Sequence, residues 1–306
     1  MRDSFAKEIT LLAEKNEKIV LLSGDIGNRM FDKYKKVAPN RFLNCGIAEA
    51  NMMSMAAGMA LSGLRPIIYT ITPFTTTRCL EQIRIGVAYH QAPVLIVGTG
   101  SGLSYSELGP THHSLEDIAI LRSIPNINIL TPSDKQELVV QLREALKSDY
   151  PSYMRIGKKG EPSVFNENSN LGIGKANLLF EGDDILVIGI GPIISEALDA
   201  RIDLKNMGIN IGVATMGSIR PLDNDFLNLM IRKGYKKWIS IEEHGIVGGL
   251  GSTLIEWVSE NNKFSDVKVT RLGVPELFIN ELGNQSYTRR KLGIDKTGIV
   301  ELICQL

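Results

Sequence analysis

The sequence contains 306 residues, of which 43% are hydrophobic, and its 34 Lys and Arg residues equal its 34 Asp and Glu residues in number. This length supports two ordinary domains with cores of their own, and the balanced charge argues against nucleic acid or an anionic membrane as a partner. The three cysteines, Cys45, Cys79 and Cys304, form no CxxC pair, which favours a reducing compartment over a disulfide framework or a zinc site. The N-terminal segment lacks the apolar core of a signal peptide, and the apolar runs are too short to span a membrane, so we expect a cytoplasmic protein.

Short apolar runs rich in Val and Ile alternate with longer segments of helical period in the first half of the chain. Ser133 and Asp134 suit the start of a helix because their short side chains bond free N–H groups there, and Gly63 suits a helix end. The predicted strands are 19–22, 67–71, 94–97 and 127–130, and the predicted helices are 4–15, 48–61, 78–90 and 134–147. This alternation predicts a parallel sheet with helices on both faces.

A polar stretch from 157 to 170, with Gly and Asn residues, interrupts the pattern and is typical of a linker. The alternation then returns, with predicted strands at 185–190, 209–214, 238–242 and 267–272 and predicted helices at 192–207, 223–233, 249–260 and 285–292. We therefore expect an α/β protein of two domains, 1–160 and 171–306, each with a largely parallel sheet.

The segment NCGIAEANMMSMAAGMAL, which begins at Asn44, carries a single carboxylate, that of Glu49. The residues that follow Glu49 are nearly all small or apolar, which predicts a helix buried on most sides. The helix dipole stabilises negative charge in the first turn of such a helix. Glu49 is therefore a candidate catalytic residue, and the alternative is an ordinary first-turn acid in contact with solvent or a neighbouring amide.

Two of the four histidines, His112 and His113, stand together in the segment GPTHHSLEDIA at 109–119. The Gly-Pro pair predicts a turn that leads into a helix. Adjacent residues of a helix point in different directions, so a metal site made of both histidines is not expected. One of them suits an acid, a base or a hydrogen-bond donor in a site, with a histidine that packs a loop as the alternative.

Taken together, GIAE with its Ala- and Met-rich helix, FTTTRCLEQIR and GPTHHSLEDIAILR resemble the pyrimidine-binding domain of transketolases and deoxyxylulose-phosphate synthases. In the second half, SIRPLD at 218–223 and IEEHGIVGGLGS at 241–252 resemble the C-terminal domain of these enzymes and of 2-oxoacid dehydrogenase β-subunits. The motifs keep the family order and spacing over essentially the whole chain. The resemblance implies a thiamine-diphosphate enzyme, and within it the C-terminal subunit of a split, two-chain transketolase.

The resemblance assigns cofactor residues position by position. Glu49 matches the glutamate that bonds N1′ of the aminopyrimidine and activates the cofactor, and Phe74 lies in the segment that stacks on that ring. His112 matches the histidine that lines the substrate channel. Asp25 and Ile26 fall where the family has an acid and a bulky apolar residue that supports the bent cofactor.

Three further positions concern the substrate. Arg2 and Arg155 match positions that hold a sugar phosphate in transketolases, with an ordinary surface or strand-end arginine as the alternative for each. The family has an aspartate that recognises a donor hydroxyl where this chain has Leu108, which cannot accept a hydrogen bond. We therefore expect a sugar donor whose hydroxyl pattern differs from that of a pentose-phosphate transketolase.

The family holds the diphosphate and Mg²⁺ in a separate N-terminal domain, with a Gly-Asp-Gly motif and a downstream Asn. The segment Gly24-Asp25-Ile26-Gly27-Asn28 is only superficially similar, because the last glycine of the motif and its spacing are missing. The resemblance therefore implies that this chain holds no metal, and that an N-terminal transketolase-type subunit carries the Mg²⁺. It also implies self-association of this chain into a dimer within an α₂β₂ complex.

The expected reaction is the transfer of a two-carbon ketol unit between sugar phosphates or related sugars. The alternatives are a 2-oxoacid dehydrogenase β-subunit, a carboligase similar to deoxyxylulose-phosphate synthase and, from another class, a non-catalytic structural or regulatory homologue. The segment GPTHHSLEDIA favours ketol transfer, and Glu49 argues against a non-catalytic homologue because an unneeded buried carboxyl would cost stability. We expect Glu242, Glu243 and His244 to be structural or interface groups.

Overall fold

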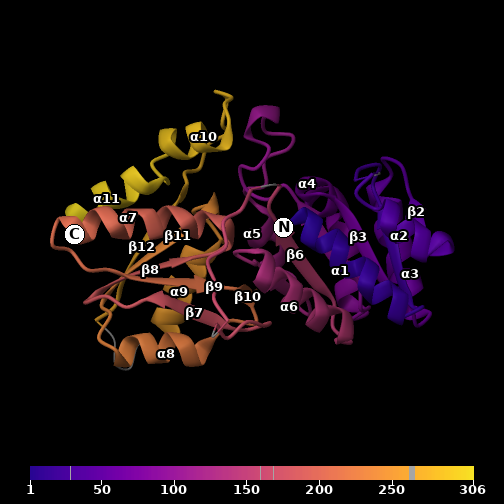
Figure 1. The fold of residues 1–306 in the computed structure, drawn as a ribbon, viewed down its shortest axis with the longest axis horizontal. Coiled ribbons are helices and arrows are strands. Elements are labelled where there is room, and N and C mark those ends of the chain that lie inside the picture. The colour runs from indigo at the N-terminus through magenta and orange to yellow at the C-terminus, as the bar shows by residue number, and fades with distance from the viewer. Residues whose placement is uncertain (28, 159, 168, 262–265) are drawn as a thin grey trace.

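The computed structural model describes residues 1–306 except 28, 159, 168 and 262–265. Two α/β units lie side by side along the long axis of the molecule (Figure 1). One holds the strands up to residue 156 and the other holds those from 176 onward. Each unit has a sheet flanked by helices, which confirms the predicted α/β class and the two largely parallel sheets.

The first unit is built on a seven-stranded sheet of order β10-β5-β6-β4-β3-β1-β2. Its own strands, all parallel, are β1 (Ile19–Ser23), β2 (Phe42–Asn44), β3 (Arg65–Ile71), β4 (Leu95–Thr99), β5 (Asn128–Leu130) and β6 (Ser152–Ile156). Its helices are α1 (Arg2–Lys15), α2 (Asp32–Val37), α3 (Glu49–Leu61), α4 (Thr72–Thr75), a π-helix (Gln82–Tyr89), α5 (Asp117–Arg122) and α6 (Lys135–Lys147). Every residue of β1, β4 and β6 is buried, because helices cover both faces of a parallel sheet.

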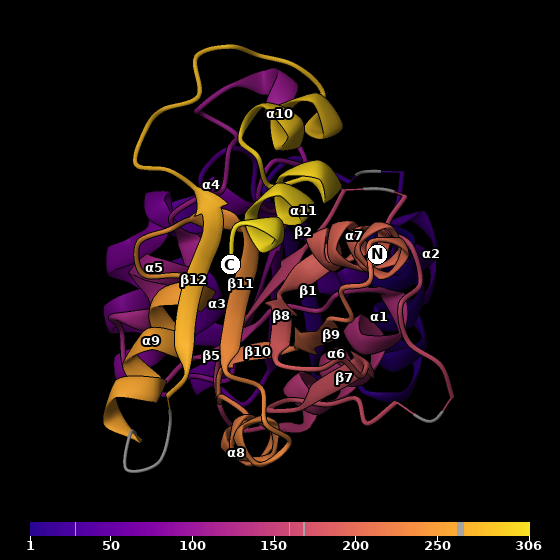
Figure 2. The ribbon, with the colours of Figure 1, turned by 90° about the vertical axis from the view of Figure 1, so that its left-hand side faces the viewer.

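The second unit is built on a five-stranded sheet of order β12-β11-β8-β9-β7, in which only β7 runs antiparallel to its neighbour. The strands are β7 (Ala176–Phe180), β8 (Ile185–Gly189), β9 (Gly212–Met216), β11 (Lys237–Gly245) and β12 (Lys268–Val274). The helices are α7 (Ile194–Asn206), α8 (Asn224–Arg232), α9 (Leu250–Glu260), α10 (Gln285–Lys291) and α11 (Lys296–Cys304). Figure 2 shows α7 and α9 on opposite sides of this sheet. On the α9 side the rings of Trp238 and Trp257 stack with centroids 6.0 Å apart.

One short strand of the second unit belongs to the sheet of the first. Strand β10 (Ser218–Arg220), from the SIRPLD segment, pairs antiparallel with β5. Beside it, the backbone N–H of Thr131 donates to the carbonyl of Gly217 at 2.9 Å, and the amide of Gln141 donates to the same carbonyl at 2.7 Å. The two units are therefore joined by backbone pairing as well as by the chain between them.

Every predicted strand overlaps an observed strand, and every predicted helix overlaps an observed helix. The predicted helix start at Asp134 is confirmed, because its carboxylate accepts hydrogen bonds from the N–H groups of Gln136 and Glu137. The sequence pattern missed strands β2, β6, β7 and β10 and helices α2, α4 and α11.

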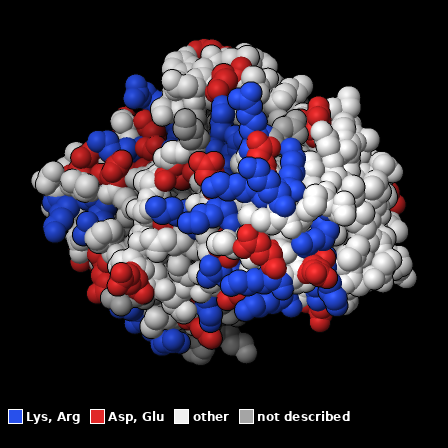
Figure 3. Space-filling view, turned by 45° about the vertical axis from the view of Figure 1, so that its right-hand side comes forward, with Lys and Arg blue, Asp and Glu red and all other residues white. Residues whose placement is uncertain are grey.

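On the face seen in Figure 3, basic and acidic side chains are interleaved. No helix in the described ranges is long and apolar enough to cross a bilayer.

Candidate functional site at the carboxyl edge of the first sheet

The predicted site residues follow the ends of parallel strands. Asp25 and Ile26 come directly after β1, Glu49 after β2, Phe74 after β3, and the loop that carries His112 after β4. In the sheet β3 lies between β1 and β4. Since the carboxyl ends of parallel strands meet at one edge, residues far apart in sequence gather there, as ligand-binding residues do in open α/β sheets.

Glu49 is the first residue of α3 and is 2% exposed. Its Oε2 accepts a hydrogen bond from Nη1 of Arg78 at 2.9 Å. The helix behind it is apolar, with Met52 and Met53 fully buried. The carboxylate therefore lies at the boundary between an apolar helix and the sheet edge, with one basic partner.

The ring of Phe74 lies next to this ion pair. The guanidinium carbon of Arg78 is 4.0 Å from the centroid of the Phe74 ring, and the His112 ring meets Phe74 edge-on at 5.4 Å. Arg78 therefore connects Glu49 to Phe74, and Phe74 in turn contacts His112. We call Glu49, Phe74 and His112 the Glu49 cluster.

His112 is half-buried, and its Nδ1 lies 2.9 Å from Oγ1 of Thr111. Burial, together with the nearby His113 and Arg78, lowers the pKa of His112 below its ordinary value. The imidazole is therefore mainly neutral at neutral pH and suits a hydrogen-bonding role. His113 is turned away and buried, with its Nε2 3.1 Å from the carbonyl of Ser106. The two histidines point in different directions, as predicted.

Asp25 and Ile26 form a turn at the end of β1. Asp25 has a φ of +55°, and its Oδ1 accepts from Nδ2 of Asn44 at 3.0 Å. The hydroxyl of Ser23 donates to the carbonyl of Ile26 at 2.6 Å. Aspartate adopts a positive φ more readily than most residues other than glycine, and the contact with Asn44 holds the turn. The cofactor contact of Asp25 and Ile26 stays a prediction. Asn28, part of the superficial metal motif, lies outside the described residues.

A polar pocket lies at the start of α1. Arg2 is half-buried there, and although burial lowers the pKa of its guanidinium, Tyr69 and Tyr105 outweigh this and raise it. Nζ of Lys158 lies 4.6 Å from the ring centroid of Tyr105, and this ring is 6.2 Å from that of His112. The pocket therefore adjoins the Glu49 cluster. Its volume of about 340 Å³ is lined by Met1, Arg2, Asp3, Lys158 and Gly160.

Lys158 was missed in the sequence because no motif singled it out. Its signal is positional: it comes two residues after β6, whose carboxyl end lies at the same edge of the sheet.

Arg155 is placed differently from the prediction. It is 4% exposed, its Nε donates to Oδ2 of Asp117 at 2.8 Å, and its Nη2 donates to the carbonyls of Ser114 and Glu243 at 2.8 and 2.6 Å. Burial alone would raise the pKa of Asp117, but the charge of Arg155, with the hydrogen bond from Tyr153, holds it below its ordinary value. Because Nε and Nη2 are engaged inside the protein, we correct the predicted phosphate contact: Arg155 forms a buried ion pair with Asp117 in the first unit and a hydrogen bond to the Glu243 carbonyl of the second.

The acidic pair and the histidine of β11 make their contacts inside the protein. The carboxylate of Glu242 accepts from the first N–H groups of α9 at 2.7 and 2.9 Å, and the carboxylate of Glu243 binds Arg289 of α10. Burial lowers the pKa of His244 to about 4, so this ring is neutral, and its Nδ1 lies 2.7 Å from the carbonyl of Gly245.

Leu108 ends the 3-10 turn Ser106–Leu108 in the loop after β4, and its side chain is 49% exposed. This loop rises beside α10 (Figures 1 and 2). The hydroxyl of Ser106 donates to the carbonyl of Gly283 at 2.7 Å, and the carboxylate of Glu107 pairs with Lys158 at 3.1 Å. Both polar neighbours are therefore engaged, and the turn presents the apolar side chain of Leu108 where the sequence resemblance predicts a substrate contact.

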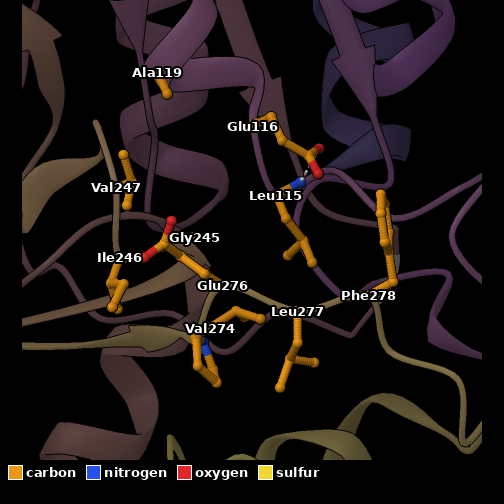
Figure 4. Close-up of a pocket in the computed structure, with 11 residues that line it drawn as sticks. Leu115, Glu116, Ala119, Gly245, Ile246, Val247, Val274, Glu276, Leu277 and Phe278 are labelled. Carbon is orange, nitrogen blue, oxygen red and sulfur yellow. Dashed lines mark hydrogen bonds between the residues drawn. The ribbon is translucent and has the colours of Figure 1, made fainter.

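A second, apolar pocket lies where the start of α5 meets the ends of β11 and β12. Figure 4 shows its side chains around a shared space, with the carboxylate of Glu116 beside Leu115. It measures about 380 Å³ and is lined by Leu115, Glu116, Ala119, Gly245, Ile246, Val247, Val274, Pro275, Glu276, Leu277 and Phe278. None of these described residues belongs to the Glu49 cluster, so this pocket is distinct from the predicted cofactor position.

Comparison with known families covers both units. The family described as transketolase, pyrimidine binding domain, matches residues 1–161, and the family described as transketolase, C-terminal domain, matches residues 174–299.

Two relatives match along nearly their full length. An apulose-4-phosphate transketolase subunit of Phocaeicola vulgatus is 35% identical over 303 residues, which cover 97% of this chain and 94% of that protein. The 6-deoxy-6-sulfo-D-fructose transketolase subunit SqwH of a Clostridium species is 31% identical, with 98% of this chain and 92% of that protein covered. The 1-deoxy-D-xylulose-5-phosphate synthase of Halothermothrix orenii is 32% identical over 99% of this chain but only 47% of its own length.

A solved structure described as a split gene transketolase, inactive beta4 tetramer, superposes with a TM-score of 0.88 at 30% identity, covering 99% of this chain and 96% of that one. The chain therefore belongs to the transketolase family, and it corresponds to the C-terminal subunit of its split members.

Proposed function

We propose that this chain binds the aminopyrimidine half of thiamine diphosphate in a two-chain transketolase, and that the complex transfers a two-carbon ketol unit between sugar phosphates or related sugars. One observation carries the proposal: Arg78 bonds the buried carboxylate of Glu49 and also lies over the Phe74 ring, which His112 meets edge-on. The two transketolase subunits that match nearly the whole chain, from Phocaeicola vulgatus and a Clostridium species, support it.

The Glu49 cluster fits an aminopyrimidine. Arg78 bonds Glu49 at 2.9 Å and stacks on Phe74 at 4.0 Å, so a flat hydrogen-bonding group reaches both residues at once. When bound, the thiazolium of thiamine diphosphate supplies the electron sink for carbon–carbon bond cleavage. Glu49 would exchange a proton with the ring nitrogen, and Phe74 would hold the plane of the ring and exclude water. The neutral His112 would hydrogen-bond an oxygen of the substrate.

The diphosphate and Mg²⁺ are proposed to lie on a partner subunit. Within the part of the chain that the structure describes, no group of three or more His, Cys, Asp or Glu side chains could hold a metal ion. Relatives that are themselves named as transketolase subunits support a partner. We propose an α₂β₂ complex in which two copies of this chain associate with two copies of an N-terminal transketolase-type subunit.

The substrate is proposed to be an anionic ketose. Arg2 and Lys158 line the polar pocket next to Tyr105 and His112, where they would bind a phosphate or sulfonate at the far end of the sugar. Leu108 offers no acceptor to a donor hydroxyl. The names of the two relatives give apulose 4-phosphate and 6-deoxy-6-sulfo-D-fructose rather than xylulose 5-phosphate. These names support an anionic donor other than xylulose 5-phosphate for this chain as well.

Purification of the tagged chain from its native source tests the assembly. The expected result is a co-purifying chain of similar length with a Gly-Asp-Gly motif and a downstream Asn, and a complex mass that matches α₂β₂ and shows ketol transfer. A chain that purifies only with itself and still transfers ketol units would contradict the proposal.

Substitution of Leu108 by Asp should shift donor preference toward ordinary ketose phosphates. The aspartate would accept a hydrogen bond from a donor hydroxyl, and a site that bonds a hydroxyl rejects analogues without it more strongly than an apolar site does. The measurement is kcat/KM of the wild-type and Leu108→Asp complexes on xylulose 5-phosphate and on a deoxy analogue, with Leu108→Met as the control that keeps the position apolar. Equal preference in the wild-type and Leu108→Asp complexes would place donor recognition elsewhere.

A further inference from the structure

One guanidinium makes both contacts that the proposed function assigns to the aminopyrimidine. Nη1 of Arg78 donates to Glu49 at 2.9 Å, and the carbon of the same guanidinium lies 4.0 Å from the centroid of the Phe74 ring. We infer that Arg78 is a displaceable placeholder for the ring: it bonds Glu49 and covers Phe74 in the free subunit, and it leaves both when the ring binds. This inference rests on the proposed function.

The guanidinium of Arg78 and the aminopyrimidine ring cannot occupy the same face of Phe74 at the same time. A ring stacked on Phe74 would lie at the distance at which the guanidinium now lies. His112 also contacts this ring, edge-on with the centroids 5.4 Å apart, and the phenylalanine is half-buried, so the space around Phe74 is limited. Entry of an aromatic ring on the Arg78 side therefore requires that the guanidinium move.

The guanidinium and the aminopyrimidine ring also make different hydrogen bonds with Glu49. A guanidinium only donates, so the oxygen of Glu49 acts as an acceptor while Arg78 is bound. A pyrimidine nitrogen with a free lone pair requires a donor, which the carboxyl provides only when it carries a proton. Glu49 therefore cannot serve both partners through the same oxygen.

The structure explains why Arg78 is present and why it can leave. Glu49 is 2% exposed, and a buried carboxylate without a partner is strongly destabilising, so Arg78 protects the free subunit. The Arg78 side chain is 46% exposed and belongs to the short 3-10 turn Thr77–Cys79, so it can rotate into solvent. Displacement by the ring would not leave Glu49 without a partner, because the ring nitrogen would replace the guanidinium as its hydrogen-bond partner.

The first test is the affinity of the two-chain complex for thiamine diphosphate, measured by calorimetry at fixed Mg²⁺. Arg78→Met keeps the length of the side chain but removes its charge and donors. It is expected to lower the Kd about fivefold, the factor that corresponds to one half-exposed ion pair. Arg84→Met is the matched control, because Arg84 is exposed, pairs with Glu81 at 3.8 Å and should leave the Kd and the turnover unchanged. An unchanged or raised Kd in Arg78→Met would overturn the inference.

The second test uses the free chain and needs no cofactor. Arg78→Met should lower its Tm, because Glu49 loses its partner, and the double variant Glu49→Gln/Arg78→Met should recover most of the loss. Equal Tm values for the wild type and Arg78→Met would overturn the placeholder role in the free subunit. If the wild-type complex binds no thiamine diphosphate, the proposed function fails instead. If it binds and turns over while Arg78→Met leaves its Kd unchanged, only the inference about Arg78 fails.

Discussion

Glu49→Gln is expected to leave the fold intact and to reduce kcat of the complex by at least about 10²-fold, the range of a positioned proton-transfer group. Glutamine keeps the shape of the side chain and can still donate a hydrogen bond, but it cannot exchange a proton with the ring nitrogen. Because the carboxyl lies at the first residue of α3 against buried methionines, the substitution removes a charge without opening a cavity.

Two measurements on Glu49→Gln separate chemistry from folding. Turnover and hydrogen–deuterium exchange at C2 of the bound cofactor should fall together, while the Tm of the free chain should hold or rise. Glu107→Gln, which changes a half-exposed carboxylate outside the cluster, should leave exchange at C2 unchanged. Unaltered exchange at C2 in Glu49→Gln would show that another group activates the cofactor.

Arg155→Met is expected to destabilise the free chain by about 3–5 kcal/mol, the loss typical of a broken buried ion pair. The substitution would leave the carboxylate of Asp117, which is 2% exposed, without its cation, and would also free the carbonyls of Ser114 and Glu243. Urea unfolding at neutral pH measures the loss. The double variant Asp117→Asn/Arg155→Met should be less destabilised than the sum of the single variants.

A surface ion pair provides the control for Arg155. Arg65 pairs with Asp149, whose side chain is 91% exposed, so Arg65→Met should change stability far less. If Arg155→Met instead raised KM for a phosphorylated sugar and left the free energy of unfolding unchanged, Arg155 would be a phosphate ligand after all.

The fold was largely predictable because its strands are buried on both faces. A strand such as β1 or β4 is apolar at nearly every position. Such an apolar run can be recognised in the sequence without knowing which elements pack against the strand. Strands β2 and β10 contain three residues each, too few for a pattern. The pairing of β10 with β5 joins residues far apart in the sequence, and no local rule places a strand of the second unit in the first sheet.

The sequence predicted the candidate site residues that stand in motifs, but it did not predict contacts that depend on the direction of a side chain. Glu49, Phe74 and His112 stand in recognisable motifs, and the sheet edge brings them together. Arg155 was misplaced because neighbouring residues of a strand point to opposite faces, and the sequence did not show that its side chain points at Asp117. The partner of Glu49, Arg78, lies 29 residues away, so only the structure shows the pair.

Calorimetric titration of the chain with thiamine diphosphate and Mg²⁺, alone and with its partner subunit, tests the central claim most directly. We predict weak binding and no turnover for the chain alone, because in the proposed complex it would supply the pyrimidine contacts and the partner the diphosphate site. We predict tight binding with ketol transfer once the partner is added. Micromolar binding together with full activity of the isolated chain would contradict the account.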